Sequence, residues 1–319
     1  MRLVLTRLSA LGDIVHAWPL ATALAAAGHE VAWVVEEPLR ELVDGHPAVR
    51  LVVTAATRRW RRRPFAPSSF AGIRASVGAI RAFRPDAAVD PQGLLKSAAW
   101  AALAGIPRRI GLDRAFRRER LAGLLYTEVV RPAPGTAHVV DLNLSLLTAL
   151  GVTPPEGAAP DGGFMLAGPP PARPARDAPA VIVPGAGRAD KVWPAARWSR
   201  LAARLSDRLP VVVAWGPGEE RLARAIVADA GRRAVVAPPT SIRDFAGLAA
   251  GAAVVVGGDT GPVHLAASLG VPTVAVFVTT DPRRNGPRGR RVAVAPGAPP
   301  DVDAVERAVG AALEVFAVT

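Results

Sequence analysis

Short apolar runs rich in β-branched residues alternate along this chain with longer, alanine-rich segments of helical periodicity. Such alternation is typical of parallel sheets whose two faces are covered by helices. The predicted strands are Leu3–Thr6, Val31–Val35, Leu51–Val53, Ala87–Val89, Arg109–Ile110, Ala180–Val183, Val211–Ala214, Ala234–Val236, Ala253–Val256, Thr273–Phe277 and Val292–Val294. The predicted helices are Ile14–Ala27, Leu94–Leu103, His138–Leu150, Ala195–Leu209, Glu219–Ala230, Ile242–Ala249, Val263–Leu269 and Val302–Phe316. The chain is therefore predicted to have an α/β fold built from doubly wound sheets.

A segment rich in proline and glycine interrupts this alternation near the middle of the 319-residue chain. A chain of this length suits two domains of ordinary size. We expect a Rossmann-like domain in residues 1–155, a linker in residues 156–178, and a second Rossmann-like domain in residues 179–319 whose last helix could pack back on the first domain. If the two domains face each other, the cleft between them is the expected ligand site.

The composition excludes several kinds of site. The chain has no cysteine, which rules out disulfides, thiolate metal ligands and a cysteine nucleophile. Its five histidines make no spacing typical of zinc, and we predict neither a metal nor a cofactor. The N-terminal run Leu3–Leu5 lacks the long apolar core of a signal peptide, and no apolar stretch is long enough to span a membrane. We therefore expect a soluble, cytoplasmic protein.

The formal net charge of +12 is concentrated in the first half of the chain. Residues 1–150 carry a balance of +8 and residues 151–319 one of +4, and the densest arginine runs are Arg58–Arg63 and Arg114–Arg120. Such runs bind polyanions, which include nucleic acid, anionic lipid and phosphorylated or carboxylated substrates. A solvated arginine-rich face explains any single run equally well. No nucleic-acid-binding module accompanies the runs, so we expect no nucleic-acid partner.

The first candidate site follows the first predicted strand, at Ser9–Asp13. Asp13 stands just before a predicted helix, where an aspartate is a good N-cap. The same carboxylate lies where the carboxyl end of a central strand opens, and there it could act as a general base toward a sugar hydroxyl. The segment lacks the GxGxxG pattern, which argues against a nicotinamide cofactor.

A second candidate site is the glycine-rich turn Gly257–His264 in the second half of the chain. Its glycines allow close backbone approach, and the exposed N–H groups at a helix start favour a phosphate. Thr260 can add a hydroxyl donor, and Asp259 could either cap the helix or bind a hydroxyl. His264 stands on the first turn, where it is either a ligand contact or an ordinary helix histidine.

Only two of the 39 basic residues are lysines, Lys96 and Lys191, and both fall in loops at the ends of predicted strands. A lysine is a compact point charge, unlike the planar fork of an arginine. Lys191 could neutralise a pyrophosphate and so stabilise a leaving group without a metal. In the next loop, Glu219 or Glu220 could hold ribose hydroxyls, or could simply favour a helix N-terminus.

Taken together, these segments resemble the family 9 glycosyltransferases over nearly the whole chain. The resemblance rests on Gly12-Asp13, Trp33–Glu37, Arg58–Arg61, Asp90–Ala98, Lys191–Pro194 and Asp259–His264. The second, third and fourth of these segments resemble the type I lipopolysaccharide heptosyltransferases within the family. The resemblance implies a GT-B fold and an inverting, metal-independent transfer at the cytosolic face of the inner membrane. It also implies ADP-heptose as donor and a Kdo residue of Kdo-lipid A as acceptor.

The resemblance further implies a role for each matching residue. Asp13 would be the general base. The implied donor contacts are Lys191, Thr260, Gly261 and His264 at the phosphates, Asp259 at the heptose, and Glu219 or Glu220 at the ribose. The implied acceptor contacts are Arg58, Arg59, Arg61, Lys96, Arg118 and Arg120. The basic first half would then meet Kdo carboxylates, lipid phosphates and an anionic membrane surface.

One departure from the family concerns the donor loop. Some relatives carry two threonines where this chain has Ala186 and Gly187, so backbone N–H groups must replace the hydroxyl contacts. Three alternatives stay open beside the leading reading: another family 9 transferase with a different sugar, an epimerase-like sugar-nucleotide enzyme, and a non-catalytic basic module that binds nucleotide or membrane. We expect a monomer.

Overall fold

The computed structural model describes residues 1–169, 175 and 177–317, and these form two compact units. The first unit is Met1–Ala159 and the second is Pro160–Thr319. The predicted linker therefore lies partly outside the described residues, at 170–174 and 176. Each unit is described by itself, and the predicted cleft stays a prediction.

The first unit contains a parallel six-stranded sheet with the strand order β3-β2-β1-β4-β5-β6. Its strands are β1 Arg2–Thr6, β2 Glu30–Glu36, β3 Val49–Ala55, β4 Ala87–Asp90, β5 Arg108–Leu112 and β6 Glu128–Val130. The central strands are buried on both faces, as their unbroken Val, Leu and Ala runs predict. Sequence patterning misses β6, because this edge strand has only three residues, one of them charged.

The helices of the first unit differ from prediction in two predicted segments, and the two helices between β3 and β4 are not predicted at all. They are α1 Leu11–Val15, α2 Trp18–Ala26, α3 Thr57–Arg62, α4 Pro67–Ala82, α5 Leu95–Leu103 and α6 Val139–Leu144, with 3₁₀ turns at Glu37–Leu42 (η1), Arg120–Leu125 (η2) and Ser145–Leu150 (η3). The single helix predicted over Ile14–Ala27 is wrong, because Pro19 lacks an N–H and its ring would clash with the carbonyl of Val15 in a continuous helix. Pro19 instead stands in the first turn of α2, where it is well tolerated. The helix predicted over His138–Leu150 continues beyond α6 only as 3₁₀ turns.

The second unit repeats the same topology. Its strands are β7 Ala180–Val183, β8 Val211–Val213, β9 Ala234–Val236, β10 Val254–Gly258, β11 Thr273–Val276 and β12 Val292–Val294, in the parallel order β12-β11-β10-β7-β8-β9. Its helices are α7 Ala195–Ser206, α8 Glu220–Ala228, α9 Ile242–Ala250, α10 Gly261–Ser268, α11 Pro282–Asn285 and α12 Val302–Ala317, with short 3₁₀ turns at Gly163–Met165 and Ala189–Lys191. The indole rings of Trp193 and Trp198 pack edge to face in its core, 4.7 Å apart. Helix α12 packs on α7 and on strands β10, β11 and β12 of this unit.

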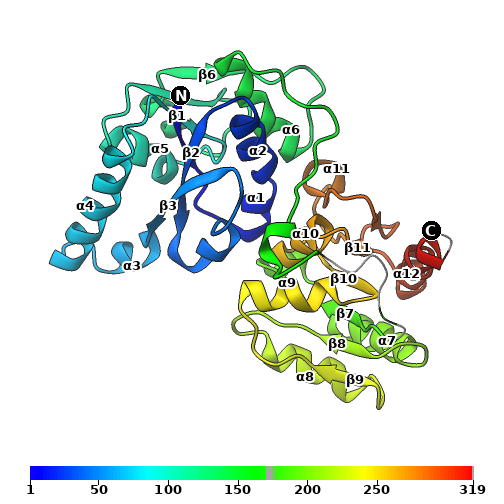
Figure 1. The fold of residues 1–319 in the computed structure, drawn as a ribbon. Helices are drawn as coiled ribbons and strands as arrows, with labels where there is room; N and C mark the ends of the chain where they lie inside the picture. The colour runs from blue at the N-terminus through cyan, green and yellow to red at the C-terminus, as the bar shows by residue number, and fades with distance from the viewer. Residues whose placement is uncertain (170–174, 176, 318–319) are drawn as a thin grey trace. The chain divides into compact units, whose positions relative to one another are not determined.

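Both sheets have the strand order 3-2-1-4-5-6 when each unit is numbered from its own first strand. In such sheets the chain leaves the first and fourth strands in opposite directions, which opens a crevice at their carboxyl ends. The two switch points are β1 beside β4 and β7 beside β10, and β1, β7 and β10 are labelled in Figure 1. Three of the predicted site segments follow these strands directly. The segment with Asp13 follows β1, the one with Lys191 follows β7, and the one with Asp259 follows β10.

A buried aspartate fixes the turn after β4. The carboxylate of Asp90 accepts hydrogen bonds from the Ser97 hydroxyl and the Tyr126 hydroxyl, each at 2.8 Å, and from the N–H groups of Gln92 and Gly93. The side chain of Gln92 in turn accepts a hydrogen bond from the N–H of Leu8 at 2.7 Å, which ties this turn to the loop after β1. Burial raises the pKa of Asp90, and these donors only partly offset it.

We expect Tyr126→Phe to lower the free energy of unfolding by about 1–3 kcal/mol, because it removes a donor from a buried carboxylate. Urea unfolding of the parent and the variant measures this difference. Tyr126 is the only tyrosine of the chain, so alkaline titration of its phenol gives a second readout. Burial and the nearby Asp90 raise the pKa of Tyr126, so the folded phenol should stay protonated above pH 10. An unchanged urea midpoint together with an ordinary phenol titration would contradict the network.

Candidate functional site

Asp13 lies in the crevice of the first unit, but it is not the N-cap residue. Helix α1 begins at Leu11, so Asp13 is its third residue and Ala10 precedes the helix. Its carboxylate oxygen Oδ2 accepts a hydrogen bond from the N–H of Ala10 at 3.2 Å. The N-cap prediction for Asp13 is therefore wrong, although the side chain still satisfies a free N–H at the helix start. The Asp13 side chain is 17% exposed, so solvent or a ligand can reach it.

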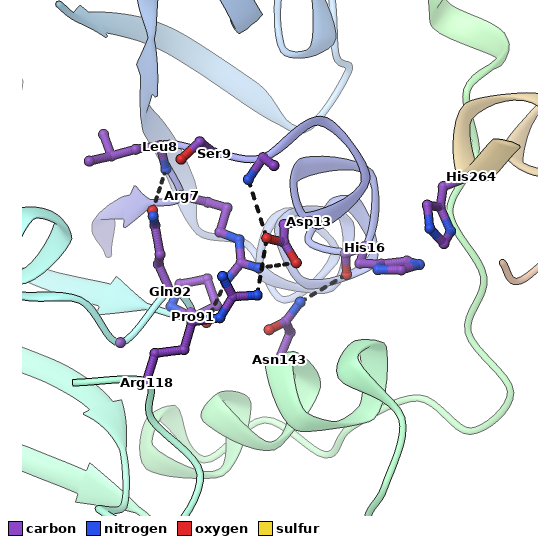
Figure 2. Close-up of polar contacts among 12 residues, drawn as sticks. Arg7, Leu8, Ser9, Asp13, His16, Pro91, Gln92, Arg118, Asn143 and His264 are labelled. Carbon is purple, nitrogen blue, oxygen red and sulfur yellow. Dashed lines mark hydrogen bonds and ion pairs between the residues drawn. The ribbon is translucent and has the colours of Figure 1, made fainter. Parts of the chain in front are cut away.

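A buried arginine that sequence reasoning did not single out holds this carboxylate (Figure 2). Arg7 is the first residue after β1, and it is 2% exposed. Its guanidinium lies 2.8 Å from Asp13 Oδ1 and donates a hydrogen bond to the carbonyl of Pro91 at 2.7 Å. The carbonyl of Arg7 accepts a hydrogen bond from the indole of Trp33 at 3.1 Å. Arg7 thus fixes the orientation of Asp13 and joins the loops after β1 and β4.

Two predicted acceptor residues lie beside this carboxylate. The exposed Arg118 places Nη2 3.4 Å from Asp13 Oδ2. Lys96, in the first turn of α5, donates from Nζ to the Ser9 hydroxyl at 3.4 Å. The first unit therefore gathers three cations around the loop that holds Asp13. Such a surface favours an acidic ligand.

The other predicted acceptor residues lie elsewhere on the first unit. Arg58, Arg59 and Arg61 are exposed on α3, which follows β3, and β3 is separated from β1 by β2. Arg59 forms an ion pair with Glu37 at 3.3 Å. Arg120 is exposed at the start of η2. Of the predicted acceptor cations, Arg118 and Lys96 are the two that the structure places against the Asp13 loop.

The crevice of the second unit holds a tight ionic cluster. Lys191 Nζ lies 2.6 Å from Asp259 Oδ2, and the hydroxyl of Thr280 donates to the same oxygen at 2.6 Å. The ring nitrogen Nε2 of His264 lies 3.6 Å from the other oxygen, Oδ1. Burial alone would raise the pKa of Asp259, but the contacts with His264, Lys191 and Thr280 outweigh it and hold this pKa well below its usual range. Asp259 is therefore a firmly ionised carboxylate.

This cluster corrects one prediction and adds one residue. Asp259 does not cap α10, because Thr260 precedes the helix and the carboxylate of Asp259 is engaged by the cluster. The hydroxyl of Thr260 makes no capping hydrogen bond either, so the start of α10 has no side-chain cap. Thr280 was missed because it follows β11, 21 residues after Asp259, and a single threonine in a loop gives no signal.

The structure distinguishes the two candidate glutamates. Glu220 pairs with Arg224 one turn along α8, at 2.6 Å, as surface helix residues commonly do. Glu219 precedes the helix and accepts a hydrogen bond from the N–H of Gly216 at 2.9 Å. A side chain at Gly185 would meet the Glu219 carboxylate at 2.1 Å, so this carboxylate lies against the loop after β7. Glu219 is the glutamate that belongs to the crevice.

The loop after β7 has open space at one of the two positions, Ala186 and Gly187, where the resemblance implies hydroxyls in some relatives. Ala186 is half-buried and Gly187 is exposed. A side chain added at Gly187 would meet nothing within 4 Å, so the missing side chain leaves open space there. Gly257 is the opposite case, because a side chain there would meet Val263 and Val183 at less than 3 Å. Its absence allows the close approach of α10 to the sheet.

Within the residues that the structure describes, no group of three or more His, Asp or Glu side chains is arranged to hold a metal ion. Over the same residues, no helix combines the length and apolarity that crossing a bilayer requires.

Comparisons with known proteins show the family of this chain. Residues 73–302 match the sequence profile of glycosyltransferase family 9 (heptosyltransferase). The chain belongs to this family. It is 36% identical over 297 residues to lipopolysaccharide heptosyltransferase 1 of Pseudomonas aeruginosa, an alignment that covers 91% of this chain and 82% of the relative.

Solved structures also resemble this family 9 glycosyltransferase. The E. coli heptosyltransferase WaaC, solved with ADP, matches with a TM-score of 0.84 at 31% identity and covers 98% of this chain and all of that one. A UDP-GlcNAc 2-epimerase from Neisseria meningitidis has a TM-score of 0.54 at 10% identity over 97% of this chain and 91% of that one, and so shares the fold alone. The two Rossmann-like units of this glycosyltransferase thus have the GT-B fold class, as predicted.

Proposed function

We propose that this enzyme transfers L-glycero-D-manno-heptose from ADP-heptose to a Kdo residue of Kdo-lipid A. The observation that carries the proposal is that each unit has a held ionic cluster at its own switch point, Asp13 with Arg7 in the first and Asp259 with Lys191 in the second. The relatives support it, because they are lipopolysaccharide heptosyltransferases, and WaaC was solved with ADP and with ADP-2-deoxy-2-fluoro heptose.

In this mechanism Asp13 is the general base. Its carboxylate takes the proton of the acceptor hydroxyl while that oxygen attacks the anomeric carbon of the heptose. The bond from the anomeric carbon to the phosphate oxygen breaks, ADP leaves with the bonding electrons, and the configuration inverts. Arg7 holds Oδ1 of Asp13, and the acceptor proton goes to Oδ2, the oxygen on the side of the Ala10 N–H and the exposed Arg118.

On the donor side, Lys191 neutralises the charge that develops on the departing ADP. The first N–H groups of α10, with Thr260, Gly261 and His264, add donors for the pyrophosphate. Asp259 holds Lys191 in place and contacts the heptose, and Glu219 binds the ribose hydroxyls. The backbone of Ala186 and Gly187 lines the phosphates, and the reaction needs no metal.

On the acceptor side, Arg118 and Lys96 bind the Kdo carboxylate beside the base. The exposed Arg58, Arg59, Arg61 and Arg120 meet the phosphates of lipid A. Because the acceptor is a membrane lipid, we propose that the enzyme works as a peripheral protein on the cytoplasmic face of the inner membrane, as a monomer.

The deciding experiment is incubation with Kdo-lipid A and a panel of sugar nucleotides, read by product mass and ADP release. We expect one heptose to be added with ADP-heptose and no loss of rate in EDTA. Transfer of a different sugar would point to another family 9 specificity. Nucleotide or membrane binding with no product from any donor would favour a non-catalytic module, and strict dependence on an added divalent cation would contradict the role of Lys191.

Arg7 provides a test of how the base is held. We expect Arg7→Met to lower kcat while ADP affinity stays near that of the parent, because Asp13 loses the buried guanidinium that orients it. Arg7→Lys keeps the charge but not the planar fork and should recover only part of the rate. The matched control is Arg2→Met, since Arg2 is an exposed arginine of β1 that pairs with Glu30 at 3.8 Å. If Arg7→Met turns over as fast as Arg2→Met, Arg7 does not position the base.

A further inference from the structure

The segment between Gly45 and Pro85 has nine arginines and no acidic residue. The densest part is the corner where α3 ends and α4 begins, at Arg58–Phe70, hereafter the α3–α4 corner. In the first unit this corner lies at the outer end of α4, beside α3 (Figure 1, cyan). Arg58, Arg59 and Arg61 already have a role toward the acceptor in the proposed function, whereas Arg62 and Arg63 have none. Both of these are exposed.

Two large apolar side chains project from the same corner. Phe65 is 87% exposed and Phe70 is 55% exposed. Single exposed apolar residues are ordinary, but two phenylalanines five positions apart within an arginine cluster form an apolar patch with a basic rim. Aromatic side chains flanked by cations are the combination that favours the boundary between lipid headgroups and acyl chains.

The corner is held by the core, so the phenylalanines are presented in fixed positions. Trp60 of α3 is 8% exposed and packs against Trp100, with ring centroids 5.9 Å apart. A side chain at Gly72 of α4 would meet the indole of Trp60 at 2.8 Å, which shows how closely the two helices approach. The turn between them is closed by the hydroxyl of Ser69, which donates to the carbonyl of Arg63 at 2.7 Å.

We propose that the α3–α4 corner is the membrane-docking surface of this protein and that it binds an anionic phospholipid bilayer. Phe65 and Phe70 enter the interface below the headgroups, and Arg62 and Arg63 bind lipid phosphates beside them. The charge pattern favours an anionic bilayer, because the segment itself has no acid and, among the residues that the structure describes, only Arg50 and Arg59 of its arginines form ion pairs with acids outside it, Glu30 and Glu37. This inference rests on the proposed function only in taking the acceptor to be a membrane lipid.

The test is co-sedimentation of the full chain with vesicles of phosphatidylglycerol and phosphatidylcholine, and with vesicles of phosphatidylcholine alone. We expect binding to the anionic vesicles, weakened by salt. The double variant F65S/F70S should lose at least roughly tenfold in partitioning, and R62S/R63S roughly fivefold for each arginine. The matched control is Val129→Ser on the edge strand β6, where an exposed apolar residue, 51% exposed, stands between Glu128 and Val130, and it should bind as the parent does.

The docking proposal and the proposed function fail in different ways. On a soluble Kdo acceptor without acyl chains, F65S/F70S should keep the parent's rate, because neither phenylalanine is placed in the active site. If F65S/F70S and R62S/R63S bind anionic vesicles as the parent does, the docking proposal is overturned whatever the enzyme transfers. Binding of a single-stranded RNA probe without vesicle binding would overturn it as well. If the vesicle results hold but no heptose is transferred, the docking surface stands and the proposed function fails.

Discussion

Replacing Asp13 by asparagine is expected to lower kcat by about 10²–10⁴-fold, the usual contribution of a positioned general base. Asparagine keeps the size of the side chain and can still accept the N–H of Ala10, but it cannot take the proton of the acceptor hydroxyl. Donor affinity should stay near that of the parent, because the groups proposed to bind ADP-heptose all lie in the second unit. Product mass with ADP release gives the rate, and calorimetric titration with ADP gives the affinity.

The matched control for this variant is Asp44→Asn. Asp44 lies in the same unit, its side chain is 39% exposed, and it pairs with the exposed Arg40 at 2.6 Å. It should keep the parent's rate, since exposed ion pairs contribute little. If Asp13→Asn turns over as fast as Asp44→Asn, another group accepts the proton and the proposed base is wrong.

The second large effect is expected at Lys191. Lys191→Met should lower kcat/KM by roughly 10²–10³-fold, the range seen when one charge-stabilising donor is removed from an active site. It should also lower the free energy of unfolding, because Asp259 is 6% exposed and loses the ammonium 2.6 Å away. Breaking a buried pair by removing one partner typically costs about 3–5 kcal/mol. Because Lys191 is only half-buried, we expect the loss in the free energy of unfolding to lie at or below the low end of that range.

A paired variant separates the catalytic loss from the structural one. Lys191→Met with Asp259→Asn removes both charges and should recover most of the stability, as measured by urea unfolding. It should recover no activity, because the leaving group still lacks its cation. Lys191→Arg adds a test of residue type, since the guanidinium keeps the charge but is larger and planar. Parent activity in Lys191→Arg would show that a lysine is not required here.

The first part of the site could be read from the sequence because it is local. Gly12-Asp13, the Lys191 loop and the turn Gly257–His264 each follow a strand that its apolar run predicts, and in a parallel sheet the residues after a strand lie at the ligand-binding edge. The predicted strand positions match the structure within two residues for 11 of the 12 strands. The strand that was not predicted is β6, a short edge strand whose three residues show no clear hydrophobic pattern.

The contacts that give each group its chemistry could not be read in this way. Local propensity favoured Asp13 and Asp259 as helix caps, yet both carboxylates are held mainly by cations. Lys191 and Asp259 are 68 residues apart in the chain, and Arg7 reaches Pro91 across 84 residues. Such pairs depend on which strands become neighbours, and the order of strands is decided by packing of the whole sheet.

The sequence by itself determined the doubly wound α/β class and placed the proposed site residues in loops that follow predicted strands. Hydrophobic periodicity and the Gly and Pro residues that mark turns are local properties, because each depends on a few consecutive residues. Tertiary structure alone decided that Arg7 supports Asp13, that Glu219 rather than Glu220 lies against the loop after β7, and that Phe65 and Phe70 stay outside the core. These outcomes depend on the partners that distant segments supply, because a charge or an aromatic ring takes its role from what surrounds it.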